Sequence, residues 1–100
     1  MKTVNLGNVK GIALGQGRCF VVGTKEIAVF RQRDGKLFAV QARCPHKQGP
    51  LADGICGDGK IICPLHGHKF DLASGEGSEA GESVHVYEVS EQNGEIFLSL

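Results

Sequence analysis

The centre of the chain, residues 44–71, has the sequence CPHKQGPLADGICGDGKIICPLHGHKFD. It contains two short motifs that each combine one thiol with one imidazole, Cys44-Pro45-His46 and Cys63-Pro64-Leu65-His66. Thiolate and imidazole groups are the side chains that soft and borderline transition metals prefer as ligands. Two motifs that each offer one sulfur and one nitrogen therefore predict a metal centre held by two loops.

The mixed pairing of ligands favours a [2Fe–2S] cluster over a zinc ion. Structural zinc sites usually pair like ligands, as Cys-x(2–4)-Cys and His-x(3–5)-His. In this chain each motif can place its cysteine on one iron and its histidine on a second iron, so that the two motifs together complete both metal ions. On spacing alone, a Cys₂His₂ zinc site in a binding module without redox function stays an alternative.

The two motifs and the residues that follow them resemble a Rieske iron–sulfur domain. The resemblance rests on residues 44–51 (CPHKQGPL) and 63–71 (CPLHGHKFD), and it extends through Gly75 to the apolar run Val84–Val89. It implies one Rieske-type [2Fe–2S] cluster per chain and a protein that transfers electrons. The ligands that it implies are Cys44, His46, Cys63 and His66.

The residues after the first ligand pair indicate a subfamily and thus a partner. The run His46–Leu51 is most similar to the small subunit of assimilatory NAD(P)H-dependent nitrite reductase, which implies a larger partner with flavin and sirohaem. The alternative is a Rieske ferredoxin that supplies an aromatic-ring dioxygenase and works with its reductase. Oxygenases that use this cluster need a further domain with a mononuclear iron site. We therefore expect an electron-transfer subunit of an oxidoreductase, without catalytic residues of its own.

Residues that match the surroundings of the cluster in this family imply a low reduction potential. High-potential relatives carry a disulfide between the two loops, and Gly49 and Leu65 occupy the matching positions in this chain. Those relatives also carry a serine and a tyrosine that donate hydrogen bonds to sulfur, where this chain has His68 and Phe70. Fewer such donors stabilise the reduced cluster less, so we expect a potential in the lower part of the family range.

The rest of the chain has the pattern of an all-β fold. Turn signals at Gly23-Thr24, Asp34-Gly35, Asp58-Gly59 and Asn93-Gly94 separate β-rich runs. These runs are Cys19–Val22, Ile27–Arg31, Lys36–Ala42, Ile61–Ile62, Val84–Val89 and Ile96–Leu100, while Val9–Leu14 is compatible with a short turn of helix. We expect an antiparallel β-sandwich or barrel as the base of the molecule.

The two motifs lie in the longest stretch of weak strand character, which is rich in glycine and proline. A chain of 100 residues forms one domain. We predict a single Rieske-type domain with a β base from residues 1–42 and 73–100 and an inserted cluster-binding subdomain at about 43–72. A proline-containing loop often covers the cluster in this family. Residues 73–83 contain no proline, so the sequence leaves this cover open.

Composition argues against nucleic acid and membrane as partners. The formal net charge is zero, and no basic stripe with interleaved aromatic residues is present. No run approaches the ~20 apolar residues of a membrane span. Residues 1–15 lack a signal-peptide pattern. Because metal-binding thiols suit a reducing compartment, we expect a cytoplasmic protein.

Four thiol and imidazole residues outside the predicted ligand set receive structural roles. Cys19 is expected in the core, Cys56 as a free thiol in a loop, and His85 on the surface of a strand. His68 is expected as a polar group near the rim of the cluster.

Overall fold

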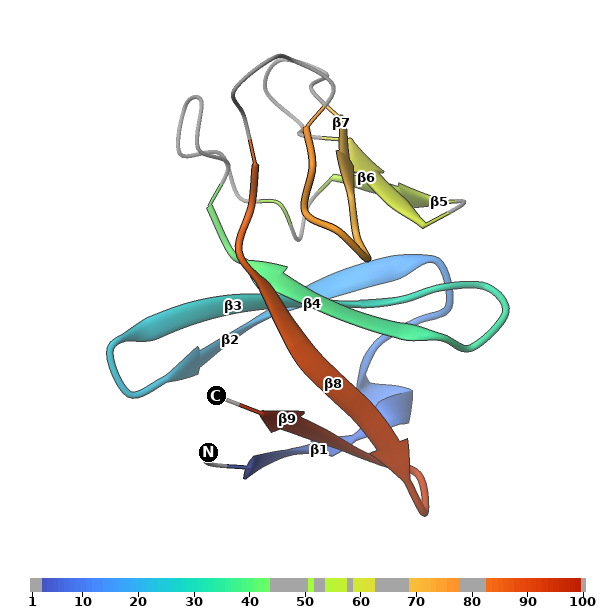
Figure 1. The fold of residues 1–100 in the computed structure, drawn as a ribbon. Coiled ribbons are helices and arrows are strands. Elements are labelled where there is room, and N and C mark those ends of the chain that lie inside the picture. The colour runs from blue at the N-terminus through green and yellow to red at the C-terminus, as the bar shows by residue number, and fades with distance from the viewer. Residues whose placement is uncertain are drawn as a thin grey trace.

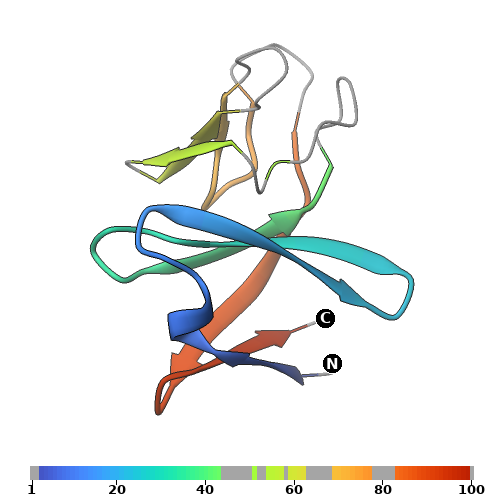
Figure 2. The same ribbon diagram turned by 180° about the vertical axis from the view of Figure 1, so that it is seen from behind.

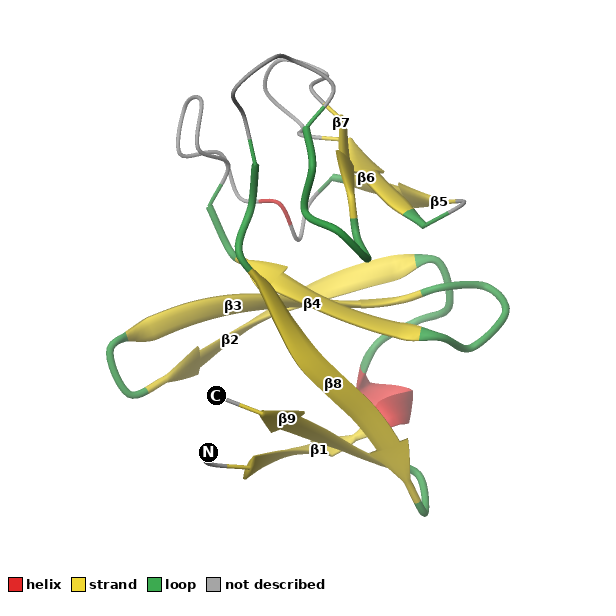
Figure 3. Cartoon of the chain, viewed as in Figure 1, coloured by secondary structure: helices red, strands yellow, loops and turns green. Residues whose placement is uncertain are grey.

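A computed structural model of the chain describes residues 3–43, 51, 54–57, 59–62, 69–77 and 83–99, apart from the side chains of Ile55 and Cys56. These residues are almost entirely β-structure, with a 3₁₀-helix, η1 (Val9–Gly11), near the N-terminal end (Figure 1 and Figure 3). The predicted all-β class is confirmed.

The described residues form nine strands in two antiparallel sheets. The six-stranded sheet has the order β1-β9-β8-β4-β3-β2. Its strands are β1 (Thr3–Asn8), β2 (Gln16–Val22), β3 (Lys25–Arg31), β4 (Leu37–Gln41), β8 (Val86–Gln92) and β9 (Glu95–Ser99). The three-stranded sheet has the order β5-β6-β7, with β5 (Ile55–Gly57), β6 (Lys60–Ile62) and β7 (Lys69–Asp71).

The small sheet lies on one side of β2, β3 and β4, and β9 and β1 lie on the other side (Figure 1 and Figure 2). We call the six-stranded sheet with η1 the base, and the described residues between 51 and 77 the upper lobe. Thr3 pairs with Ser99 in the register of β1 and β9. Both ends of the described chain therefore lie side by side, on the face of the base that is remote from the upper lobe (Figure 1).

The turns of the base follow from their sequence. Asn93 and Gly94 connect β8 to β9 and both have positive φ, 53° and 79°, as a two-residue type I′ hairpin requires. Residues 23–24 connect β2 to β3, and residues 32–36 connect β3 to β4. Strands β2, β3, β4 and β9 correspond to the predicted runs Cys19–Val22, Ile27–Arg31, Lys36–Ala42 and Ile96–Leu100. The predicted run that starts at Val84 becomes a strand only at Val86.

Strands β3 and β4 separate two apolar cores and contribute side chains to both. Alternate residues of a strand point to opposite faces, and both faces of this pair are covered. One face contributes Ile27, Val29 and Ala39 to the base core, which also contains Val9, Ile12, Ile96 and Leu98. The other face contributes Ala28, Phe30 and Val40 to the upper core, which also contains Ala42, Leu51, Ile61, Phe70, Leu72 and Val84.

Two expectations for cysteine are wrong. Cys19 is exposed, because β2 is an edge strand whose inward positions are taken by Phe20 and Val22, which pack against the base core. Cys56 lies in strand β5 and not in a loop. His85 is exposed, as expected, but it lies directly before β8 and not in a strand. The predicted boundaries of the subdomain stay a prediction.

Candidate metal centre

The four predicted ligands, Cys44, His46, Cys63 and His66, lie outside the described residues, as does His68. The structure describes the backbone up to Arg43 before the first motif, and up to Ile62 and from Lys69 on either side of the second motif. The geometry of the site is therefore built from the residues that flank the two motifs.

The two ends of the first motif segment are joined by a backbone hydrogen bond. The Leu51 N–H donates to the Ala42 carbonyl oxygen at 2.9 Å. Ala42 is 4% exposed and Leu51 is fully buried, and both belong to the upper core. Ala42 and Leu51, which flank the first motif segment, thus meet at one buried point of the described structure.

The second motif segment connects two paired strands. Ile62 and Lys69 are partners in the antiparallel register of β6 and β7, and Ile61 pairs with Phe70 one step further along. The side chains of Ile61 and Phe70 are fully buried in the upper core. Residues 63–68 therefore join the ends of a short hairpin whose inner face is held by apolar packing.

Gly54 brings the flanks of the two motifs together. Its N–H donates to the Leu51 carbonyl oxygen at 2.9 Å, and a Cβ atom on Gly54 would lie 2.1 Å from the carbonyl oxygen of Ile62. Only glycine allows the backbone to approach this closely. The end of the first motif segment thus lies next to the start of the second, as two loops that share one metal centre require.

Charged side chains of both signs line a groove beside β6 and β7, the strands that flank the second motif in the sequence. The groove has a volume of about 220 Å³ and is lined in part by Lys60, Lys69, Asp71 and Glu76. The backbone N–H groups of Ser74 and Ala73 donate to Asp71 Oδ1 at 3.0 and 2.8 Å, and they lower the pKa of this carboxyl group below its ordinary value of 3.8. The described lining of this groove therefore carries two basic and two acidic side chains.

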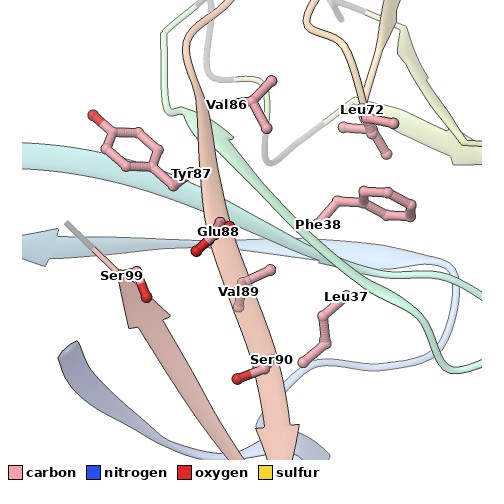
Figure 4. Close-up of a pocket in the computed structure, with 10 residues that line it drawn as sticks. Leu37, Phe38, Leu72, Val86, Tyr87, Glu88, Val89, Ser90 and Ser99 are labelled. Carbon is pink, nitrogen blue, oxygen red and sulfur yellow. The ribbon is translucent and has the colours of Figure 1, made fainter. Parts of the chain in front are cut away.

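A second groove in the described structure lies elsewhere. It has a volume of about 420 Å³ and lies between β4 and β8, whose register covers two residue pairs. Phe38, Leu72 and Val86 lie at its upper end, and Leu37 and Val89 at its lower end (Figure 4). Its lining contains no thiol or imidazole, so this groove is not the predicted metal centre.

The described residues supply no competing metal site. Within the described ranges, no group of three or more histidine, cysteine or acidic side chains is arranged to hold a metal ion. Cys19 lies exposed on β2, and the His85 ring packs edge-on against Tyr87 with ring centroids 4.5 Å apart.

The described residues form an all-β fold, and the two Cys/His motifs lie in the sequence next to strands and core residues of the upper lobe. A model of the Rieske-like [2Fe-2S] domain family matches residues 3–99, so the chain belongs to this family. The family carries a Rieske [2Fe–2S] cluster. The two thiols and two imidazoles of the motifs are the donor set that such a cluster needs.

Relatives of this chain include dioxygenase ferredoxin subunits and oxygenases. The chain is 38% identical over 78 residues to the anthranilate 1,2-dioxygenase ferredoxin subunit of Burkholderia cepacia, covering 76% of this chain and 71% of that protein. Other curated relatives are much longer oxygenases, and the chain spans 13% of their length. Among solved structures, the ferredoxin of carbazole 1,9a-dioxygenase from Nocardioides aromaticivorans has a TM-score of 0.87 and 25% identity, covering 99% and 98% of the two chains.

A putative NADH-dependent nitrite reductase small subunit from Mycobacterium tuberculosis has a TM-score of 0.89. The superposition covers 97% of this chain and 93% of that protein, and the two sequences are 23% identical. At that level of identity the similarity shows the fold alone. In the described part of the chain, no helix has the length and apolar character that crossing a membrane requires.

Sequence reasoning missed two residues that shape the surroundings of the motifs. Leu51 lies in a segment that the sequence predicts to be a loop, but it is a fully buried core residue. Its apolar side chain was the one sequence feature that could have indicated this burial. Gln41 makes hydrogen bonds to two separate backbone segments, and no sequence pattern indicates this.

Proposed function

We propose that this chain is a one-electron carrier whose [2Fe–2S] cluster is held by Cys44, His46, Cys63 and His66. The observation that carries the proposal is the family match over residues 3–99, which includes both Cys/His motifs. When bound, the cluster supplies a reversible one-electron couple with a reduction potential that its imidazole ligands raise above that of all-cysteine clusters.

The chain's own residues provide a rigid and apolar support for this centre. Leu51, Ile61 and Phe70 are fully buried and pack against Phe30 and Val40 of the base. Close packing of this kind resists displacement of the attached loops and keeps water away from the buried side of the site. The same packing favours electron transfer with little rearrangement of the protein.

For the partner, we propose the large subunit of an assimilatory NAD(P)H nitrite reductase, with this chain as the small subunit in the cytoplasm. The support is the run His46–Leu51 after the first cysteine, which is most similar to that subfamily. The nearly balanced charges around Lys60, Lys69, Asp71 and Glu76 favour a contact that depends on close packing more than on long-range steering.

A second candidate is a ferredoxin for an aromatic-ring dioxygenase. The specific observation in its favour is the 38% identity to the anthranilate 1,2-dioxygenase ferredoxin subunit over most of both chains. Both candidates use the same cluster and the same fold, so the distinction lies in the partner.

The cluster is tested by analysis of anaerobically purified protein. We expect two irons and two acid-labile sulfides per chain, a red-brown colour, and the rhombic electron paramagnetic resonance (EPR) spectrum of a reduced Rieske centre. His66→Ala should abolish the cluster, because one iron loses a required ligand. Reconstituted protein that binds one zinc per chain and no iron would instead support the zinc-stabilised binding module.

The partner is tested by complementation. We expect the chain to restore NAD(P)H-driven nitrite reduction in a strain that lacks its own small subunit and retains the matching large subunit. The His66→Ala variant serves as the control without a cluster. Support of an aromatic-ring dioxygenase and not of nitrite reduction would select the ferredoxin role and leave the cluster assignment intact.

A further inference from the structure

The chain passes from the base to the upper lobe and back along two adjacent backbone segments. It leaves β4 through Ala42–Arg43 and returns to β8 through Val84–His85 (Figure 1). The Gln41 N–H donates to the His85 carbonyl oxygen at 3.0 Å, and Val40 pairs with Val86 in the register of β4 and β8. The two segments therefore run side by side where they leave the base.

The side chain of Gln41 joins these two segments. Its Nε2 atom donates to the Arg43 carbonyl oxygen at 2.7 Å, and its Oε1 atom accepts from the His85 backbone N–H at 2.9 Å. Both distances are those of well-formed hydrogen bonds. A carboxamide supplies the donor and the acceptor that this bridge requires, whereas an ionised carboxylate supplies acceptors only.

The surroundings of Arg43 show why this bridge matters. Ala42 is buried and held by two backbone hydrogen bonds, from its N–H to the Glu26 carbonyl oxygen at 3.1 Å and from Leu51 to its own carbonyl oxygen at 2.9 Å. The next side chain, that of Arg43, is 50% exposed and forms an ion pair of 3.5 Å with Glu26, which is 46% exposed. The bond from Gln41 therefore acts where the backbone leaves the buried core.

We propose that Gln41 is a positioning residue for the metal centre. The inference rests on the proposed function, in which Cys44 is a ligand. Because a peptide unit is planar, a hydrogen bond to the Arg43 carbonyl oxygen orients the peptide that joins Arg43 to Cys44. Gln41 thus holds the backbone that carries the first ligand in a fixed relation to β8.

Two substitutions separate the two bonds of the bridge. Gln41→Glu keeps an acceptor for the His85 N–H and removes the donor to Arg43. Gln41→Leu removes both bonds without adding charge. The matched control is Gln16→Glu, because Gln16 is exposed on β2 and its substitution makes the same change in net charge.

The test compares reconstituted holoproteins that carry these substitutions. We expect both Gln41 variants to lose the visible absorbance of the cluster about five- to tenfold faster than the wild type in the presence of a chelator, as the loss of one hydrogen bond worth roughly 1 kcal/mol would produce. Their reduced EPR spectra should also differ from the wild-type spectrum, while Gln16→Glu should match it. Exchange of the His85 amide proton should accelerate in Gln41→Leu and not in Gln41→Glu.

Two results would overturn the positioning role. The first is a wild-type rate of cluster loss and a wild-type EPR spectrum in both Gln41 variants. The second is a lower melting temperature with an unchanged rate and spectrum, because Gln41 would then only stabilise the fold. A wild-type chain that binds no [2Fe–2S] cluster would refute the proposed function itself, and this measurement precedes the comparison of variants.

Discussion

The base and the upper lobe differ in the length of their strands and in their cores. Strands of the base have five to seven residues, are joined by short turns and enclose a core of their own. Strands of the upper lobe have three residues, and its core is shared with β3 and β4. The base core contains no residue of the upper lobe. Three-residue strands are too short to be stable alone. The upper lobe therefore depends on the base, while the base can retain its own core when the upper lobe opens.

This asymmetry suits a domain that must both stay folded and hold a metal centre. The base supplies stability through alternating apolar residues, and the upper lobe supplies close backbone approaches at Gly54 and Gly75. Four experiments test this difference between the base and the upper lobe.

The largest effect is expected for Gly75→Ala. Gly75 has a φ of +83°, and a Cβ atom there would lie 2.2 Å from the Val84 carbonyl oxygen. The substitution should lower the free energy of unfolding by about 3 kcal/mol or more, measured by urea denaturation. The control is Gly23→Ala, where φ is +64° and nothing lies within 4 Å, so only about 1 kcal/mol should be lost. Equal losses would show that the close approach at Gly75 is easily relieved.

The next effect concerns the two cores. Leu51→Ala and Leu98→Ala each remove a fully buried leucine, from the upper core and the base core respectively, and each should cost about 2–5 kcal/mol. We expect Leu51→Ala to accelerate amide exchange at Ile61 and Phe70 while Ile96 stays protected, and Leu98→Ala to accelerate exchange in both regions. An identical pattern in the two variants would mean that base and upper lobe unfold as one unit.

A smaller effect is expected for Phe70→Tyr. Phe70 is fully buried in the upper core, so a new hydroxyl group without an acceptor would cost about 1–3 kcal/mol. If the hydroxyl group donates to cluster sulfur, the reduction potential should rise by roughly tens of millivolts from a wild-type value below about +50 mV, with little loss of stability. Voltammetry and thermal denaturation distinguish the outcomes, and a stability loss at constant potential would contradict the role implied for this position.

The smallest effect is a dependence of stability on pH from Asp71. Its folded-state pKa lies below the ordinary 3.8, so its contribution to the free energy of unfolding is fully present above that value and is lost as pH falls through the lower folded pKa. Asp71→Asn keeps an oxygen that can accept from Ser74 and Ala73, and it should remove this acid-range dependence. Asp71→Ala should weaken the turn at neutral pH as well, and equal melting temperatures of the two variants at pH 7 would contradict this account.

The sequence predicted the base better than the upper lobe, for physical reasons. Turns with Asn-Gly or Asp-Gly and alternating apolar residues are local signals, and they indicated β2, β3, β4, β8 and β9. Strand β1 was missed because Asn5, Gly7 and Asn8 are poor strand formers and its pairing with β9 is interrupted by a bulge between Asn5 and Gly7. Strands β5 and β7 are too short to produce a periodic pattern.

At the candidate site, the spacing of the Cys/His motifs predicted the [2Fe–2S] cluster. It did not predict the long-range contacts that hold the flanking backbone. The Cys/His motifs are short and contiguous, so the family and its cluster could be predicted, while the ligand roles of Cys44, His46, Cys63 and His66 stay a prediction. The bridge from Gln41 to His85 joins residues 44 positions apart, and the burial of Leu51 depends on packing against the base. Such long-range contacts leave no periodic trace in one sequence.

The pairing of Thr3 with Ser99 has a practical consequence. Both ends of the described chain lie on the face remote from the upper lobe (Figure 1). A reductase, a fluorophore or an electrode linker attached at either end would be carried there, and it would leave the upper lobe open to a redox partner. A circular permutant that joins these two ends would need only a short linker, and new termini could then be opened in a hairpin turn of the base.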